Sequence, residues 1–340
     1  MTEDRAAAWR NRGGWFSWHP AATDAAPVDI FHVEAGAADA PVLLLVHGFP
    51  TCSVDWFGVI DRLAARFRVC ALDFPGYGFS DKPRGWGYTL ERDAELLEHY
   101  LANVVGTEHA VVVAHDRGDS VALVLAARNA AAGARLRLDH LMLTNANIFL
   151  PLSQLTEFQR AVLDPHRWPG VLERLTPAAL AQGMGQSTFT PPREPSAADV
   201  VALAETFAHA DGVAVLHETI QYLVERSNHE REWLLTLAAS SLPTTVAWGL
   251  YDTVSPPRVA TYVWNEFLMT KPGRNALYFV PGANHYLQCD RPNAFVDVVL
   301  HTLDADDDRP AGAISDAPGA PLVVDVSRSH LPSGADVLGA

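Results

Sequence analysis

The sequence is poor in cysteine and in basic residues. Three cysteines occur among 340 residues, and their scattered positions lack the spacing of metal ligands: Cys52, Cys70 and Cys289. We therefore expect neither a disulfide scaffold nor a metal site, and reduced thiols favour a cytoplasmic location. The 25 basic residues against 40 acidic ones give a formal net charge of −15. This charge argues against nucleic acid and anionic membranes as partners.

Long apolar runs and the serine-esterase motif are also missing. No stretch approaches the roughly 18 apolar residues of a membrane-spanning helix, and the acidic first residues do not predict a secretory signal. The motif Gly-x-Ser-x-Gly does not occur, which argues against a serine esterase. The composition, 49% apolar and 19% charged, is typical of a globular protein. We expect a small-molecule substrate, no organic cofactor and no metal, and we leave a homodimer open.

What the sequence does contain is a regular alternation of strands and helices. Val42–Val46 and Val111–Ala114 are short, β-branched, apolar runs of the kind found in buried parallel strands. Further strands are expected at 67–73, 138–144, 244–248 and 276–280, helices at 54–66, 89–105, 120–134, 257–268 and 292–303, and an N-terminal hairpin at 15–18 and 29–34. This order predicts an α/β fold with a mostly parallel sheet covered by helices.

The alternation stops between residues 147 and 242, where prolines are frequent and no strand is predicted. Helices are expected there at 152–163, 197–209 and 213–225. We interpret the segment as a helical cap inserted into an α/β core made of residues 1–146 and 243–304. Residues 305–340, rich in Asp, Pro, Gly and Ala, are expected to form a loosely attached tail, although 322–326 could add a strand.

The most informative motif is Ala114-His115-Asp116-Arg117-Gly118. It joins a predicted strand to a predicted helix through a sharp turn, with small residues two positions before and after Asp116. This is the layout of a nucleophile elbow, with aspartate where serine usually stands. A carboxylate at that position can attack a substrate and form an ester with it. The alternative is an ordinary helix-capping aspartate.

An ester of this kind needs an activated water to turn over, and therefore a histidine base and an acid that orients the histidine. Asp252 directly follows one predicted strand, and His285 follows the next. Catalytic groups in open α/β sheets gather at these strand ends. The other position for the acid, after strand 138–144, holds asparagines instead of a carboxylate. We therefore expect Asp252 as the acid, and backbone N–H groups of Phe49 and Arg117 as the oxyanion hole.

These motifs resemble the α/β-hydrolase superfamily, specifically its aspartate-nucleophile branch of epoxide hydrolases and dehalogenases. The resemblance spans residues 28–303 and rests on five motifs in order: His47 to Pro50, Asp73 to Ser80, Ala114 to Gly118, Trp248 to Asp252 and Gly282 to His285. The elbow and the segment 218–222 also resemble proteins of the mesoderm-specific transcript type.

The resemblance favours an epoxide over a halogenated substrate. Haloalkane dehalogenases usually carry Trp after the nucleophile and often Asn after His-Gly, whereas this chain has Arg117 and Phe49 there. Fluoroacetate dehalogenases use a second arginine at the position of Ser120. Epoxide hydrolases use cap tyrosines as proton donors, and Tyr222 lies where such a residue is expected. The alternative interpretation of Tyr222 is a structural tyrosine in the core. Phe49, Arg117 and Trp168 are predicted to contact the substrate.

Three readings therefore remain open. The chain is predicted to open an epoxide to a diol through an ester on Asp116. A dehalogenase would use the same aspartate chemistry on a haloacid or haloalkane. A third possibility, from another class of protein, is an α/β-hydrolase fold that binds a small ligand without catalysis.

Overall fold

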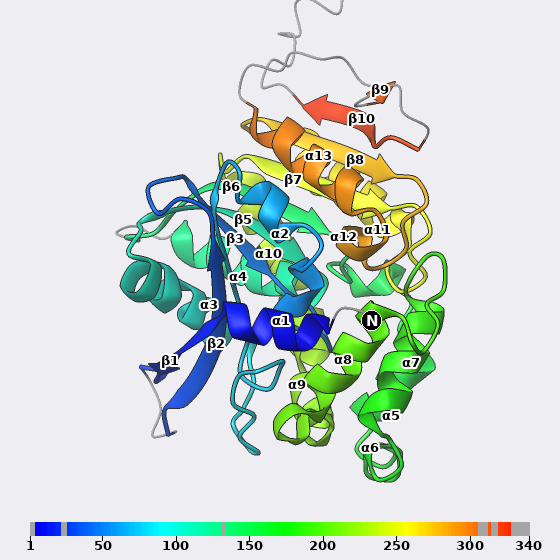
Figure 1. The fold of residues 1–340 in the computed structure, drawn as a ribbon. Coiled ribbons are helices and arrows are strands. Elements are labelled where there is room, and N and C mark those ends of the chain that lie inside the picture. The colour runs from blue at the N-terminus through cyan, green and yellow to red at the C-terminus, as the bar shows by residue number, and fades with distance from the viewer. Residues whose placement is uncertain (1–3, 22–25, 131–133, 305–311, 314–318, 328–340) are drawn as a thin grey trace, which may run out of the picture.

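The computed structural model describes residues 4–21, 26–130, 134–304, 312–313 and 319–327. Its centre is a ten-stranded sheet in the order β1-β2-β4-β3-β5-β6-β7-β8-β10-β9 (Figure 1). The strands are β1 Gly14–Trp18, β2 Val28–Ala35, β3 Val42–Val46, β4 Arg68–Leu72, β5 His109–His115, β6 Arg137–Thr144, β7 Thr244–Gly249, β8 Asn275–Val280, β9 Gly312–Ala313 and β10 Leu322–Ser327.

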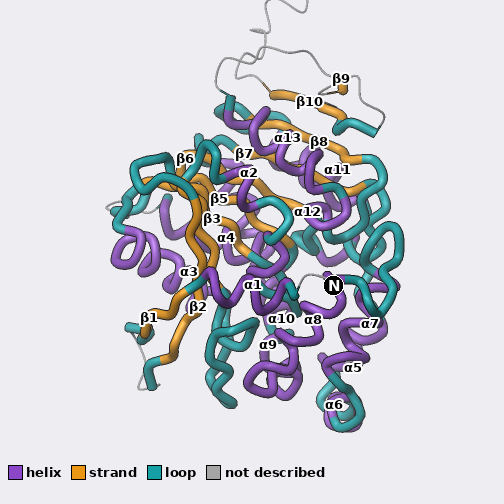
Figure 2. The backbone as a smooth tube through the Cα atoms, in the orientation of Figure 1, coloured by secondary structure: helices purple, strands orange, loops and turns teal. Residues whose placement is uncertain are grey.

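Six adjacent strands, from β4 to β8, run parallel, and antiparallel pairs extend the sheet at both edges. Every residue of β3 and β7 is buried, as expected for parallel strands that helices cover on both faces. Figure 2 shows the strands running between helices. The mostly parallel α/β architecture predicted from the sequence is confirmed.

Helices and short helical turns fill the connections. They are α1 Arg5–Arg12, η1 Ser53–Trp56, α2 Ile60–Leu63, α3 Leu90–His99, η2 Tyr100–Val105, α4 Arg117–Asn129, η3 Leu150–Leu152, α5 Glu157–Leu163, α6 Trp168–Leu172, α7 Pro177–Ser187, α8 Ala198–Ala208, η4 His209–Val215, α9 Leu216–Thr219, α10 Tyr222–Ala239, α11 Pro257–Val263, η5 Trp264–Leu268, α12 Leu287–Asp290 and α13 Pro292–Leu303.

Four predicted helices differ from the structure. The one expected at 152–163 begins at Glu157, and the one expected at 213–225 is divided among η4, α9 and α10. The expected helix 54–66 is instead two short turns, η1 and α2, around Gly58. All four residues of η1 are buried, so packing against the core sets the path of this segment. The helix expected from Ser120 begins at Arg117, which leaves Asp116 directly at its N-terminus. That shift brings the backbone N–H groups of the first helical turn to the side of Asp116.

Within the described residues, the segment 147–242 contains helices and no strand. Helices α5 to α9 gather together beside one end of the sheet (Figure 1). The long helix α10 packs instead against α4, the helix that follows Asp116. It therefore links the helical segment to the core. The division into core, cap and tail stays a prediction.

The stretch Ala198–Thr219 is long and apolar enough to span a membrane by length and composition, and half of its most apolar window is buried. It is not one regular helix, because Ala210 and Asp211 have φ values of 47° and 55° between α8 and α9. Such a break and such burial are typical of core packing.

Part of the predicted tail joins the sheet. Strand β10 pairs with β8 from Leu322 opposite Phe279 to Ser327 opposite Asn275, and Val323 is buried. The alternative of an added strand is therefore confirmed for this part. The rest of the predicted tail, residues 305–311, 314–318 and 328–340, lies outside the described residues.

Candidate active site

Asp116 occupies a sharp turn between β5 and α4. Its backbone has φ 52° and ψ −114°, a conformation that L-residues rarely adopt. The turn needs small neighbours: a Cβ on Gly118 would lie 2.5 Å from the carbonyl oxygen of Val46, and one on Gly48 would lie 2.6 Å from the Cβ of Asp116. The local geometry is thus that of the elbow predicted from the sequence.

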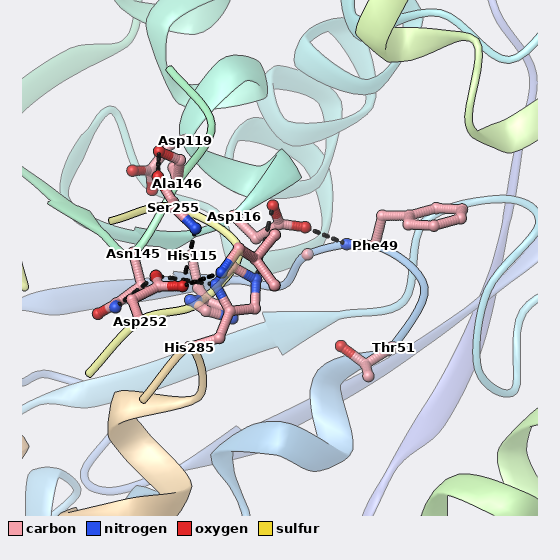
Figure 3. Close-up of polar contacts among 12 residues, drawn as sticks. Phe49, Thr51, His115, Asp116, Asp119, Asn145, Ala146, Asp252, Ser255 and His285 are labelled. Atoms are coloured by element: carbon pink, nitrogen blue, oxygen red, sulfur yellow. Dashed lines mark hydrogen bonds and ion pairs between the residues drawn. The ribbon is translucent and has the colours of Figure 1, made fainter. Parts of the chain in front are cut away.

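The side chain of Asp116 does not cap the helix. It makes no capping hydrogen bond, although the residue stands at the N-cap position of α4. Instead, the backbone N–H of Phe49 donates to its Oδ2 at 3.0 Å (Figure 3). The N–H of Arg117, the first residue of α4, has no acceptor within the helix. Both N–H groups of the predicted oxyanion hole therefore come from residues beside this carboxylate.

The second oxygen of the same carboxylate faces the histidine. Oδ1 of Asp116 lies 3.8 Å from Nε2 of His285, and no described residue donates a hydrogen bond to it. Both side chains are almost completely buried. An oxygen with free lone pairs, shielded from water, is a competent nucleophile.

Asp252 holds His285 from behind (Figure 3). Nδ1 of His285 and Oδ2 of Asp252 are 3.0 Å apart. The other oxygen, Oδ1, accepts the backbone N–H groups of Val254 and Ser255, each at 2.8 Å. The carboxylate is therefore fixed at both oxygens, and its proximity fixes the tautomer of the histidine in turn.

Asn145 completes this arrangement and was not predicted. Its Nδ2 donates to Oδ2 of Asp252 at 2.8 Å, and its Oδ1 accepts the N–H of Gly249 at 3.1 Å. The residue follows β6 with φ 49°. The sequence argument rejected this position because it lacks a carboxylate, whereas its place after a parallel strand was the signal that it reaches the site.

The charges around His285 favour its protonated form. Burial by itself lowers the pKa of His285, but Asp252, Asp116 and Asp55 together raise it above the ordinary value. The nearby histidines are different: burial lowers the pKa of His47 to about 3, and its Nε2 accepts the N–H of Phe74. His285 is therefore the histidine suited to accept a proton in this site.

A cavity of about 240 Å³ reaches this machinery. Phe49, His285 and Tyr286 form its core side, and apolar residues of α5 and α7 such as Phe158, Leu180 and Met184 form the opposite side. Tyr286, the residue after the histidine, was not predicted as a site residue. The lining is mainly apolar, so the cavity fits an uncharged group.

Five predicted side chains are not among the residues that line this cavity: Asp116, Asp252, Arg117, Trp168 and Tyr222. Asp116 and Asp252 lie against His285, which does line it. Trp168 stacks on His217 at a centroid distance of 3.8 Å, so the structure does not bring it to the cavity. The guanidinium of Arg117 is buried in an ion pair with Asp93, because a buried cation needs a counter-charge. Tyr222 is fully buried, and its ring lies 5.9 Å from the ring of Phe49, which does line the cavity.

Among the described residues, no group of three or more His, Cys, Asp or Glu side chains could hold a metal ion. That no metal is required remains a prediction from the sequence.

The comparisons with known proteins identify the family. The model of the alpha/beta hydrolase fold family matches residues 41–292, a range that contains Asp116, Asp252 and His285. The chain belongs to this family. The superfamily inferred from the motifs is therefore confirmed, and the protein is an α/β hydrolase.

Curated relatives cover nearly the whole chain. LipZ of Mycobacterium tuberculosis, described as a hydrolase, is 32% identical over 89% of this chain and 99% of its own length. The human mesoderm-specific transcript homolog protein is 28% identical over 86% of each chain. Haloalkane dehalogenase 2 of Mycobacterium tuberculosis is 27% identical over 80% of this chain and 90% of its own length.

Solved structures show the same fold. An alpha/beta hydrolase fold protein from Burkholderia ambifaria is 25% identical, with a TM-score of 0.66, over 84% of this chain and 99% of its own. An epoxide hydrolase found in metagenomes from hot environments is 20% identical, also with a TM-score of 0.66, over 86% of this chain and 99% of its own. At that identity the second likeness concerns the fold alone.

Proposed function

We propose that this hydrolase opens an epoxide to a diol through a covalent ester on Asp116. One observation carries the proposal: Asp116 stands at a helix N-cap without capping the helix, and its two oxygens face two different groups. Oδ2 accepts the N–H of Phe49, while Oδ1 has no donor and lies 3.8 Å from Nε2 of His285. This division suits a nucleophile whose ester is later attacked by water.

In the first step, a lone pair of Oδ1 attacks a ring carbon of the epoxide, and the carbon–oxygen bond of the ring breaks. The released oxygen takes the proton of a nearby acid. The hydroxyl of Tyr222 is the acid proposed here, since it is buried without a hydrogen-bond partner in the described part of the chain. Burial and the charge of Asp116 raise the pKa of Tyr222, so the phenol carries its proton at neutral pH.

In the second step, His285 takes a proton from water, and the resulting hydroxide adds to Cγ of Asp116. Negative charge then develops on Oδ2, where the N–H groups of Phe49 and Arg117 stabilise it. The bond between Cγ and Oδ1 breaks, and Oδ1 leaves with the product after receiving the proton from His285. Asp252 stabilises the imidazolium throughout.

The lining of the cavity narrows the substrate class. His285 is the one ionisable side chain other than tyrosine among the lining residues, and most of the wall is aliphatic or aromatic. A carboxylate or phosphate would lose its hydration there, and any positive charge on His285 already faces Asp252 and Asp116. The proposed substrate is therefore an uncharged epoxide with an apolar substituent that fits within about 240 Å³.

Dehalogenation is the second candidate, and the haloalkane dehalogenase among the relatives favours it. The attack of Oδ1 would be the same, but a halide leaves as an anion and needs N–H donors. The guanidinium of Arg117 is already paired with Asp93, which makes it a poor halide ligand. We therefore rank this reaction below epoxide opening.

A substrate panel separates these reactions. Wild type and Asp116→Asn are incubated with apolar epoxides, haloalkanes and halocarboxylates, and diol and halide are both quantified. Diol formation that disappears in the variant supports the proposal. Halide release without diol from any epoxide would assign the protein to dehalogenation. Binding of these compounds without turnover would indicate a ligand-binding protein.

A further inference from the structure

Two buried arginines lie against the ring of Tyr222. The Cζ atom of Arg226 is 5.0 Å from the ring centroid, and that of Arg117 is 5.5 Å from it. All three side chains are at most 1% exposed. Arg226 follows Tyr222 by one turn of α10, whereas Arg117 comes from the start of α4. The contact between α4 and α10 thus surrounds one tyrosine with two cations.

Each guanidinium is fixed by other contacts. Arg117 pairs with Asp93, and its Cζ lies 5.2 Å from the ring centroids of both Phe74 and Tyr77. In Arg226, Nε donates to Oγ of Ser120 at 2.5 Å. A longer bond of 3.5 Å joins its Nη2 to the backbone carbonyl of Asp116. These contacts hold both guanidinium groups in place, so the two act as fixed positive charges beside the site.

The hydrogen bonding of this group is incomplete. The hydroxyl of Tyr222, Nη1 of Arg226, and Nε and Nη1 of Arg117 have no hydrogen-bond partner among the residues that the structure describes. A purely structural ion pair in a protein interior normally has its donors satisfied. Cations whose free N–H groups lie beside an aromatic ring are suited to stabilise a charge on that ring.

We propose that Arg117 and Arg226 are positioning residues that stabilise the phenolate which Tyr222 becomes after it protonates the oxygen of the opened substrate. The inference rests on the proposed function, and it names the two residues whose charges make Tyr222 a stronger acid. A phenolate spreads its negative charge into the ring, so nearby cations stabilise it more than they stabilise the neutral phenol.

The charges facing Tyr222 also give the acid its timing. Burial raises the pKa of Tyr222, Asp116 and Tyr77 raise it further, and Arg226 and Arg117 lower it. When Oδ1 of Asp116 forms the ester, the carboxylate loses its negative charge. The negative charge of Asp116 then no longer opposes the effect of the two cations on the pKa of Tyr222. Tyr222 therefore becomes a stronger acid at the stage when the substrate oxygen takes up a proton.

Hydrolysis of the ester reverses this change. Of the two protons of the attacking water, one reaches the departing Oδ1 through His285, and the other returns from the regenerated carboxyl group to the phenolate. The restored charge of Asp116 again disfavours the phenolate. Asp93, the ion-pair partner of Arg117, partly balances that cation through both steps. Burial raises the pKa of Asp119, which faces Arg226, well above its usual range, so this carboxyl group offsets Arg226 less.

The test uses Arg226→Gln, which keeps a donor for Ser120 but removes the charge, and Arg226→Lys, which keeps the charge. Arg231→Met, an exposed arginine on the same helix, is the matched control. A fluorinated tyrosine placed at position 222 reports phenol ionisation by fluorine NMR without any substrate. We expect Arg226→Gln to raise the midpoint by about one pH unit, with Arg226→Lys and the control near wild type.

Single-turnover kinetics give the second readout. Ester formation should slow about tenfold in Arg226→Gln, which corresponds to a rise of about one unit in the pKa of Tyr222, while ester hydrolysis keeps its rate. An unchanged midpoint in a folded Arg226→Gln protein would overturn the inference, as would equal slowing of both steps. If the NMR midpoint moves but no epoxide reacts, the proposed function fails and the charge control of Tyr222 stands. If Arg226→Gln does not fold, Arg117→Lys and Arg226→Lys replace it, because both keep the positive charge. Midpoint shifts of less than a few tenths of a pH unit, with normal ester formation in both variants, support the inference. Slowed ester formation in either variant contradicts it.

Discussion

On one side of Asp116, Asn145, Asp252 and His285 form a chain of close polar contacts that backbone N–H groups complete. On the other side, Tyr222 lies among Arg117 and Arg226 with its hydroxyl unpartnered. We call these the base side and the acid side. The residues of the base side follow the ends of β6, β7 and β8, whereas those of the acid side come from two packed helices.

This difference matches the roles of base and acid in the proposed reaction. A base that acts on water must keep one orientation, and satisfied hydrogen bonds hold it there. An acid must exist in a charged form for part of the cycle, and fixed nearby cations reduce the cost of that charge. The base side is therefore built for geometry, and the acid side for electrostatics.

The largest effect is expected on the base side. Asp252→Asn removes the charge that stabilises the imidazolium of His285, and should lower turnover about 10³- to 10⁴-fold. Rapid-quench kinetics should show that ester formation is retained while ester hydrolysis is lost. Near-normal hydrolysis in this variant would mean that a residue other than Asp252 orients and stabilises His285.

A smaller effect is expected on the acid side. Tyr222→Phe removes the proposed proton donor and should slow epoxide opening about 10²-fold while sparing hydrolysis of the ester. Tyr286→Phe is the comparison, because that tyrosine lines the cavity. If Tyr286→Phe loses ester formation and Tyr222→Phe keeps it, Tyr286 is the acid and the comparison of the two sides must be redrawn.

The pH dependence sharpens the description of the base side. His285 acts as a base when neutral, and its pKa is raised because Asp252, Asp116 and Asp55 outweigh the effect of burial. In the ester, Asp116 no longer contributes its charge, but Asp252 still faces Nδ1 of His285. Ester hydrolysis should therefore decline on acidification, about tenfold for each pH unit below the pKa of His285. Asp252→Asn should shift this limb to lower pH; an unshifted limb would mean that another group titrates.

Protonation of His285, which slows hydrolysis, stabilises the folded protein. Because its folded-state pKa is raised, the histidine contributes stability that is fully present below its unfolded value of about 6.5 and is lost as the pH rises through the folded value. Denaturant titrations of wild type and His285→Gln over this range should differ most at the acidic end. The pH that favours hydrolysis is thus the pH at which this stabilisation disappears.

The smallest catalytic effect is expected far from both sides. Ending the chain at Asp304 removes β10, which pairs with β8 at the edge of the sheet. Loss of the buried Val323 should cost about 2 kcal/mol of unfolding free energy, measured by denaturation, and leave turnover unchanged. A folded but inactive truncated protein would show that residues 305–340 belong to the site.

The base side was largely predictable from the sequence. Carboxyl ends of parallel strands meet at one edge of a sheet, so the positions of Asp116, Asp252 and His285 after predicted strands indicated that they converge. Asn145 was missed because an amide at that position was interpreted as the absence of a carboxylate. Its role depends on a hydrogen bond to Asp252 that strand order alone does not reveal.

The acid side was less predictable, because contacts between helices leave little trace in a motif. Arg226 was not identified, and the charge of Arg117 proved to be paired with Asp93 from α3. Trp168 was predicted to contact the substrate, but it stacks on His217 and does not line the cavity. Helix α7 was missed, since its proline, glycines and alanines give weak apolar periodicity.

The most direct test of the central claim is the mass of His285→Gln after incubation with an epoxide that the wild type hydrolyses. Without the base, the ester should form and persist, so intact-protein mass spectrometry should show one added substrate mass, and peptide mapping should locate it on Asp116. Asp116→Ala is the control and should remain unmodified. An unmodified His285→Gln protein, or an adduct at any other residue, would contradict an aspartate nucleophile at this position.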